Sequence, residues 1–430
     1  MSGDAPRADP GRPGVLAVRA RRLLDVRAGR WVPDPTVVMA AGRIQQVGGT
    51  PPAGAAVLDL GDRSLLPGLI DAHTHVLLQG NATRAAYAHQ VLEEEPAHRV
   101  VRAVRSMRVA LEHGFTTLRD LGTEGAGFAD VALRDAVAER VVPGPRLFAA
   151  GPAIGATGTY PILGYRSDWT FPVGVAECDG VAGCRREVRR QLARGVDWIK
   201  VYCSAGRGVH RTDDGYLDSP PTWTAAELRA LVDEAHAGGA PVAAHAASVT
   251  GTEMAVAAGV DSIEHGYAIR PAAAERMAAA GIALVPTLLV TREILDGRLA
   301  ERGSIWAEVP AMHRRSFANC RAAGVTLVLG TDVGGFDWLG ASQVGELEIL
   351  VELGLTPLEA IRSATVDAAR LLRQEGVLGE VTPGASADLI ACPGDPLATV
   401  TALRDVDVVV REGDLLVQPA DLRLGGTAGA

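Results

Sequence analysis

Through the middle of this 430-residue chain, short apolar segments alternate with longer amphipathic segments. The amphipathic segments, such as 97–114 and 224–240, repeat apolar residues about every 3.6 positions and finish at or near a glycine, as helices do. Eight apolar segments are expected to be strands: 65–76, 116–122, 146–154, 198–204, 241–247, 262–267, 283–289 and 326–335. Eight strands that alternate with helices over roughly 300 residues predict an α/β fold, the (β/α)8 TIM barrel.

The two ends of the chain follow a different pattern. Residues 15–66 and 379–420 contain short strand-like runs that glycines and Asp-Pro pairs interrupt, as in hairpins. We therefore expect one small β domain built from both ends, with the barrel over residues 67–378 between its two parts. Residues 1–14 are expected to be a disordered tail, because they are polar and rich in proline and glycine and lack the apolar stretch of a secretory signal. Residues 421–430 are expected to be a second tail.

The composition excludes several classes of partner. A net charge of −9 argues against binding to nucleic acid or to an anionic membrane surface. No apolar run reaches the length needed to cross a bilayer. The five cysteines are an odd number, and the two close neighbours, Cys178 and Cys184, match no common zinc pattern. The expectation is a cytoplasmic protein with reduced thiols and a small-molecule substrate, and the oligomeric state is left open.

Polar side chains gather where the predicted strands end, which is where a barrel of this kind carries its chemistry. His73 and His75 are two residues apart, so on a regular strand both point to the same face. Glu264 precedes another of these residues and is expected to point outward, in a packing or supporting role. Burying so many donors is costly unless they bind something, and imidazoles with a carboxylate suit zinc. The six candidate metal ligands are His73, His75, Lys200, His245, His265 and Asp332.

Lys200 is the only lysine in the chain, since the other 41 of the 42 basic residues (42 − 1) are arginine. Arginine can replace lysine as a surface charge, but a guanidinium cannot lose its proton and react. Burial lowers the pKa of a lysine amine from its usual value of about 10.4. A deprotonated amine can take up carbon dioxide and become a carbamate, an anion that can bridge two metal ions. We therefore expect Lys200 to have a chemical role.

Several motifs together resemble the imidazolonepropionase-related branch of the metal-dependent amidohydrolases. The resemblance covers roughly residues 15 to 415 and implies that the small β domain is a β-sandwich. The motifs that carry it are LLPGLIDAHTHV, GFTTLRDLG, GVDWIKVY, VAAHAASVTG, GVDSIEHG, LVPTLL, GTDVGG, GELEILVELGLTPLEAIRSAT and ASADLIACPGDPL.

The resemblance also implies a binuclear site that holds two divalent ions, and the expected metal is zinc. The expected ligands of one zinc are His73, His75 and Asp332, and those of the second are His245 and His265. Carboxylated Lys200 and a hydroxide would bridge the two ions, and Asp332 would act as general base and then as general acid.

The presence of Lys200 separates this chain from true imidazolonepropionases and points to the peptidase-like members. The expected activity is therefore hydrolysis of an amide bond in a dipeptide such as Xaa-Pro, or in an N-acyl amino acid. Candidate substrate contacts are Tyr202 and Tyr267, which lie one strand step beyond metal ligands, and Arg207, His210 and Arg211, in the loop after the fourth strand.

Three alternatives are weighed against this activity. A mononuclear deaminase usually carries a glutamate three residues after the histidine of the fifth strand, and here that position is Ser248. A non-catalytic scaffold would lack ligands, and none is missing. Hydrolysis of a lactone, a carbamate or a cyclic imide by the same site stays open, as do the leaving group and the metal used in the cell.

Overall fold

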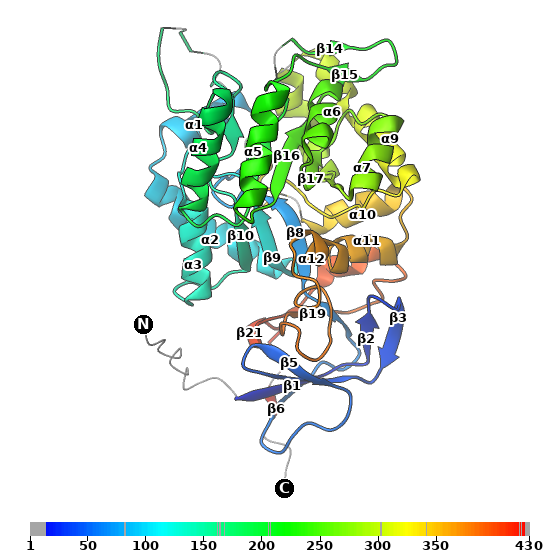
Figure 1. Ribbon diagram of the computed structural model, residues 1–430. Coiled ribbons are helices and arrows are strands. Elements are labelled where there is room, and N and C mark those ends of the chain that lie inside the picture. Colours follow the sequence, from blue (N-terminus) through cyan, green and yellow to red (C-terminus); the bar gives the residue numbers. More distant parts are fainter. Residues whose placement is uncertain are drawn as a thin grey trace.

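The structure is a computed structural model (Figure 1), which describes residues 14–425 apart from positions 81, 82, 161, 163, 164, 167, 205, 207, 302, 341, 421 and 423. An upper part, in which helices surround strands, stands on a lower part made of strands. The expected tail at 1–14 lies outside the described residues except for Gly14, and most of the tail expected at 421–430 lies outside them too.

The lower part contains two sheets, and each draws strands from both ends of the chain. One sheet has the order β22-β6-β1-β4-β5 and the other the order β21-β20-β19-β7-β2-β3. Side chains such as Val18, Leu23, Leu389 and Val408 share one apolar core, so segments far apart in sequence are packed together. The strands are β1 (Val15–Arg19), β2 (Arg22–Asp25), β3 (Arg30–Pro33), β4 (Thr36–Ala40), β5 (Arg43–Val47), β6 (Ala56–Asp59), β7 (Ser64–Pro67), β19 (Leu389–Cys392), β20 (Val408–Arg411), β21 (Asp414–Val417) and β22 (Leu424–Gly425).

The upper part contains two parallel sheets. Three strands form the sheet β10-β9-β8, and six form the sheet β12-β11-β13-β16-β17-β18. Their bounds are β8 (Leu69–Thr74), β9 (Phe115–Asp120), β10 (Arg146–Ala149), β11 (Ile154–Gly155), β12 (Ala176–Glu177), β13 (Ile199–Tyr202), β16 (Val242–Ala246), β17 (Ser262–His265) and β18 (Ala283–Val285). A separate hairpin consists of β14 (His210–Arg211) and β15 (Leu217–Asp218).

Helices follow most of these parallel strands and cover the outside of the sheets (Figure 1). None of the helices in the described parts of the chain combines the length and the hydropathy that a bilayer-spanning helix needs. The α-helices are α1 (Arg84–Leu92), α2 (Pro96–Glu112), α3 (Ala129–Ala138), α4 (Gly180–Leu192), α5 (Ala225–Ala237), α6 (Val249–Ala258), α7 (Pro271–Ala280), α8 (Leu288–Glu293), α9 (Val309–Ala323), α10 (Val344–Glu352), α11 (Pro357–Ser363) and α12 (Val366–Leu371).

Four of the expected strands differ from the structure. The segment 65–76 is divided between β7 and β8, and the segment 146–154 between β10 and β11, which belong to different sheets. The strand expected at 283–289 ends at Val285, because Thr287 takes a left-handed conformation (φ 52°) and α8 begins at the next residue. The segment 326–335 forms no regular strand and is joined to its neighbours by isolated bridges, Thr74 to Val333 and Leu284 to Leu327. This segment thus lies between β18 and β8. The strand pairing itself is divided between two sheets, so the architecture is mixed α/β.

Neighbouring residues on the parallel strands belong to two separate apolar clusters. Ile263 and Leu284 pack with helix residues such as Leu231 in the larger cluster. Trp198 and Val285 belong to a smaller cluster on the opposite faces of the strands. Because side chains alternate across a strand, the smaller cluster marks the enclosed side of the sheets. Polar residues on the same face of a strand as this smaller cluster therefore point into the enclosed space.

Candidate metal centre

An irregularity in β8 turns two histidines into the enclosed space. Asp71 pairs with Leu118, and Thr74 pairs with Asp120. Between these two pairs β8 advances by three residues while β9 advances by two, so β8 contains one extra residue. The extra residue is a β-bulge, a feature common beside active sites. Ile70 and Ala72 already point inward, and the bulge resets the alternation so that His73 and His75 turn inward as well. The centroids of the two imidazole rings are 5.4 Å apart.

The prediction that Glu264 points outward is wrong. Ile263 lies in the outer cluster, so the regular alternation of β17 directs Glu264 into the enclosed space. His265 reaches the same space by another route, because its left-handed backbone (φ 65°) ends the strand and redirects the ring. The Nδ1 atom of His265 is 2.8 Å from the hydroxyl of Thr287, and its ring centroid is 4.9 Å from that of His73.

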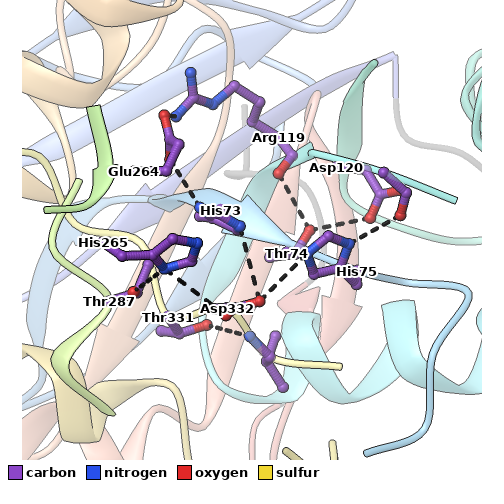
Figure 2. Close-up of polar contacts among 12 residues, drawn as sticks. His73, Thr74, His75, Arg119, Asp120, Glu264, His265, Thr287, Thr331 and Asp332 are labelled. Atoms are coloured by element: carbon purple, nitrogen blue, oxygen red, sulfur yellow. Dashed lines mark hydrogen bonds and ion pairs between the residues drawn. The ribbon is translucent and has the colours of Figure 1, made fainter. Parts of the chain in front are cut away.

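Asp332 lies between the histidines, as Figure 2 shows. Its Oδ1 atom is 3.2 Å from Nε2 of His75 and 3.7 Å from Nε2 of His73, and its Oδ2 atom is 3.9 Å from Nδ1 of His265. Asp332 also has a left-handed backbone (φ 58°), and its backbone N–H donates to the carbonyl of His73. The loop after Asp332 passes close to the backbone of His75. Gly334 makes this possible, because a Cβ atom at that position would lie 2.3 Å from the carbonyl oxygen of His75.

Glu264 and Arg119 form a buried layer behind His73. One carboxylate oxygen of Glu264 is 2.7 Å from Nδ1 of His73, and the other accepts a hydrogen bond of 2.9 Å from Arg119. Arg119 also lies over the ring of Trp198, at 4.3 Å from its centroid. Burial opposes ionisation of Glu264, but the charge of Arg119 and the contact with His73 outweigh it and lower the pKa of Glu264 to about 2. The carboxylate is therefore ionised, and it holds the proton of His73 on Nδ1.

The pKa values of His73 and His75 shift in opposite directions. Burial lowers the pKa of His73 to about 4, so its imidazole is neutral. Burial acts in the same direction on His75, but the hydrogen bond and the charge of Asp332 outweigh it and raise the pKa of His75 to about 9. Nδ1 of His75 is 2.8 Å from the carbonyl oxygen of Gly122, which fixes the ring.

Lys200 lies on the enclosed face of β13. It is 1% exposed, and burial lowers the pKa of its amine to about 8, against the opposing charges of Glu264 and Asp332. Its ammonium group makes no hydrogen bond and no ion pair with the residues that the structure describes. The structure therefore contains a buried amine whose proton is easily lost. The ring of His245, on the neighbouring strand, is 4.6 Å from that of His265.

A divalent metal ion fits this set of donors. Nε2 of His73 is buried and has no hydrogen-bond partner among the described residues, although it faces Asp332. One ligand atom from each of His73, His265 and Asp332 lies within 4.8 Å of the others. Neutral imidazoles and a carboxylate are typical zinc ligands. This trio combines residues that the sequence assigned to two different ions, and His75 lies beside it, with its Nε2 atom 3.2 Å from Oδ1 of Asp332.

The expected substrate contacts fall into two groups. Tyr202 and Tyr267 lie beside the metal centre, with ring centroids 4.8 Å from that of His245 and 5.7 Å from that of His265, respectively. His210 and Arg211 are exposed on the β14–β15 hairpin. Arg211 is paired with Glu308, and none of the described contacts of either residue reaches the metal centre. The remaining candidate, Arg207, lies outside the described residues.

Sequence reasoning missed two residues of the centre. Arg119 could have been identified from the sequence, because a charged residue inside the apolar segment TTLRDLG indicates a buried ion pair. Glu124, which accepts a hydrogen bond from Tyr202, could not have been identified in this way, because it lies in a glycine-rich loop whose sequence has no regular pattern.

Comparisons with known proteins agree with this geometry. The sequence profile of the amidohydrolase family matches residues 64–416. The ochratoxinase of Aspergillus niger is 30% identical over 370 residues, which cover 80% of this chain and 73% of that protein. A prolidase solved in complex with N-methylphosphonate-L-proline has a TM-score of 0.84 and 31% sequence identity, covering 94% of this chain and 100% of the other. A Xaa-Pro dipeptidase with methionine bound in its active site has a TM-score of 0.81 and 30% identity, covering 93% and 99%.

Proposed function

The chain belongs to the amidohydrolase family, and on that premise we propose that it hydrolyses the amide bond of a small molecule that ends in an amino acid. It is a hydrolase that acts on C–N bonds. The proposed substrates are dipeptides such as Xaa-Pro and N-acyl amino acids. The prolidase and the Xaa-Pro dipeptidase among its structural neighbours support this class of substrate, and so does the ochratoxinase. The observation that carries the proposal is the buried group of His73, His265 and Asp332.

We propose a closed eight-strand barrel over residues 67–378 as the frame of the site, with a β-sandwich domain of residues 15–66 and 379–420. Hydrogen bonds across the segment 326–335 support closure on one side. Val328 donates to the carbonyl of Leu284, and Ala72 donates to the carbonyl of Leu329, so the segment links β18 to β8.

The proposed cofactor is a pair of divalent metal ions. His73, His75 and Asp332 would hold one ion and His245 and His265 the other, with a carbamate on Lys200 as ligand to both. Bound there, the metal ions would polarise the scissile carbonyl and make an attacking water more acidic. The lowered pKa of the Lys200 amine, together with its lack of a hydrogen bond to the described residues, supports the carbamate.

Asp332 is the proposed carrier of the proton. Its carboxylate faces the enclosed space beside three imidazoles, so it can accept the proton of the attacking water and then deliver it to the nitrogen of the leaving group. Its backbone hydrogen bond to His73 fixes the carboxylate relative to the ligands. Glu264 holds His73 in the tautomer whose Nε2 faces the same space.

A hydrolysis screen on zinc-loaded protein tests the proposal. The panel would contain Xaa-Pro dipeptides, N-acyl amino acids and lactones, with release of the free amino acid or ring-opened acid followed by mass spectrometry. We expect turnover of at least one class of amide. Turnover of lactones with no amide hydrolysed would overturn the proposal and favour the alternative substrate.

A further inference from the structure

Glu124 is a buried carboxylate beside the metal centre. It lies four residues after the end of β9, in a left-handed conformation (φ 47°) that is uncommon for a non-glycine residue, and it is 2% exposed. Its Oε2 atom accepts a hydrogen bond of 2.6 Å from the hydroxyl of Tyr87, and its Oε1 atom accepts one of 3.1 Å from that of Tyr202. Strained backbone at a buried charge is typical of functional sites.

The carboxylate of Glu124 makes no ion pair with a basic side chain among the described residues, although Arg99, His75 and Lys200 lie near enough for its charge to act on them. Arg99 approaches it, but its guanidinium donates to the backbone carbonyls of Glu124 and Thr123 and not to the carboxylate. The other glutamate of the centre, Glu264, has Arg119 as its partner. The carboxylate of Glu124 therefore has nearby positive charge but no direct ion pair among the described residues. It has about four acceptor positions, of which the two tyrosines occupy two.

The surroundings of Glu124 connect it to the reacting centre. The loop that carries Glu124 also fixes a metal-ligand candidate, since the carbonyl of Gly122 accepts from His75. Tyr202 links Glu124 to His245. Its hydroxyl donates a hydrogen bond to Glu124, and its ring lies beside the ring of His245. The ring of Tyr160 lies 4.8 Å from that of Tyr202 and 5.9 Å from that of Tyr87. Three aromatic rings and one carboxylate therefore meet at the edge of the metal centre.

We propose that Glu124 binds the protonated α-amino group of the substrate. A carboxylate with free acceptor positions and an aromatic wall both attract an ammonium ion. In an amino-acid amide the ammonium nitrogen is two bonds from the scissile carbonyl carbon, so its site must adjoin the metal centre, as Glu124 does. The inference rests on the proposed amide hydrolysis and narrows it: the substrates are dipeptides with a free amino terminus, and N-acyl amino acids are disfavoured.

A pair of substrates that differ only in the amino group tests this role. L-alanyl-L-proline and N-propionyl-L-proline have the same shape and leaving group, and only the first carries an ammonium ion. We expect zinc-loaded wild-type protein to favour the alanyl compound by about 100-fold in kcat/KM, the size of a charged hydrogen bond lost from a buried site. In Glu124→Gln the preference should fall to about threefold or less, because kcat/KM for the alanyl compound falls much more than that for the propionyl compound.

Two further variants guard against a purely structural effect. Tyr87→Phe keeps the charge of Glu124 but removes one of its donors, so it should lower the preference severalfold in the same direction. Glu94→Gln, which breaks an ion pair with Arg102 outside this site, should leave the preference unchanged. Thermal unfolding and zinc content would show that each variant is folded and loaded.

Each outcome of the substrate test has a distinct meaning. Equal turnover of both compounds by the wild-type protein overturns the role of Glu124 and leaves amide hydrolysis standing. The role is equally overturned if Glu124→Gln slows both compounds by the same factor. If the wild-type protein hydrolyses neither compound nor any other amide in the screen, the proposed function fails and the inference fails with it.

Discussion

The Nδ1 atom of His73 lies 2.7 Å from a carboxylate oxygen of Glu264, and both side chains are fully buried. Arg119 holds the other oxygen of that carboxylate, so the glutamate cannot turn away. The contact fixes the proton of His73 on Nδ1 and leaves the lone pair of Nε2 directed at Asp332, where it has no described hydrogen-bond partner. A buried lone pair that faces a carboxylate is what a cation site requires.

The first prediction concerns the number of metal ions. Protein expressed with ample zinc should contain about two divalent ions per chain, because the six proposed ligands are enough for two zinc sites that share bridging groups. Elemental analysis of the purified protein measures this number. A reproducible single ion per chain would favour a mononuclear site and remove the need for a bridging carbamate.

Replacing Asp332 with asparagine should remove the proton carrier and keep its size. We expect kcat to fall by about 100- to 10,000-fold while the fold persists, as is usual for loss of a general base. Asp337→Asn is a matched control, because Asp337 is an exposed residue of the same loop and should have almost no effect. Near-normal turnover of Asp332→Asn would mean that another group moves the proton.

Lys200→Arg tests whether the single lysine is a surface charge or a metal ligand. Two unit charges repel each other by about 4 kcal/mol at 4 Å and an effective dielectric of about 20, and the repulsion between a permanent cation and divalent ions is larger. We therefore expect loss of at least one metal ion and of nearly all hydrolysis, whereas the exposed control Arg105→Lys should be neutral. Lys200→Ala should also be inactive, and short carboxylic acids with added zinc should partly restore it. Parental activity in Lys200→Arg would exclude the carbamate.

The rate at which metal-free protein recovers activity should depend on pH. Burial lowers the pKa of the Lys200 amine from 10.5 to about 8, and only the unprotonated amine reacts with carbon dioxide. Recovery in zinc and bicarbonate should thus be slow near pH 6, rise through pH 8 and level off above it. Stopped-time activity assays after dilution to a common pH measure the rate. A rate that is independent of pH over this range, or of bicarbonate, would contradict the role given to the amine.

Glu264→Gln should weaken the metal centre and the fold together. Without the carboxylate, the proton of His73 is no longer held on Nδ1, so Nε2 is less often available as a ligand. Zinc affinity should therefore fall by about 10- to 100-fold. The substitution also leaves Arg119 buried without a counter-charge, which costs about 3–5 kcal/mol of unfolding free energy. Zinc titration and denaturant unfolding measure the two effects. Glu348→Gln, which breaks the more exposed pair with Arg404, should cost at most about 1 kcal/mol.

The candidate site residues could be predicted from the sequence, and the structure brings three of them, His73, His265 and Asp332, within reach of one ion. Period-two and 3.6-residue patterns are local, so they located most of the parallel strands and the helices between them. Polar residues at the ends of those strands then had to meet, because parallel strands end at one edge. Lys200 stood out from composition alone, as the only lysine among 42 basic residues.

The directions in which the side chains point depend on the folded structure. Alternation predicts direction while a strand is regular, but the bulge in β8 and the left-handed backbone of His265 depend on pairing with distant segments. For that reason the inward position of Glu264 and its pairing with Arg119 were not predicted. The same holds for Glu124, whose partners Tyr87 and Tyr202 lie 37 and 78 positions away in the sequence. Contacts of this kind arise from packing between segments, and no local pattern records them.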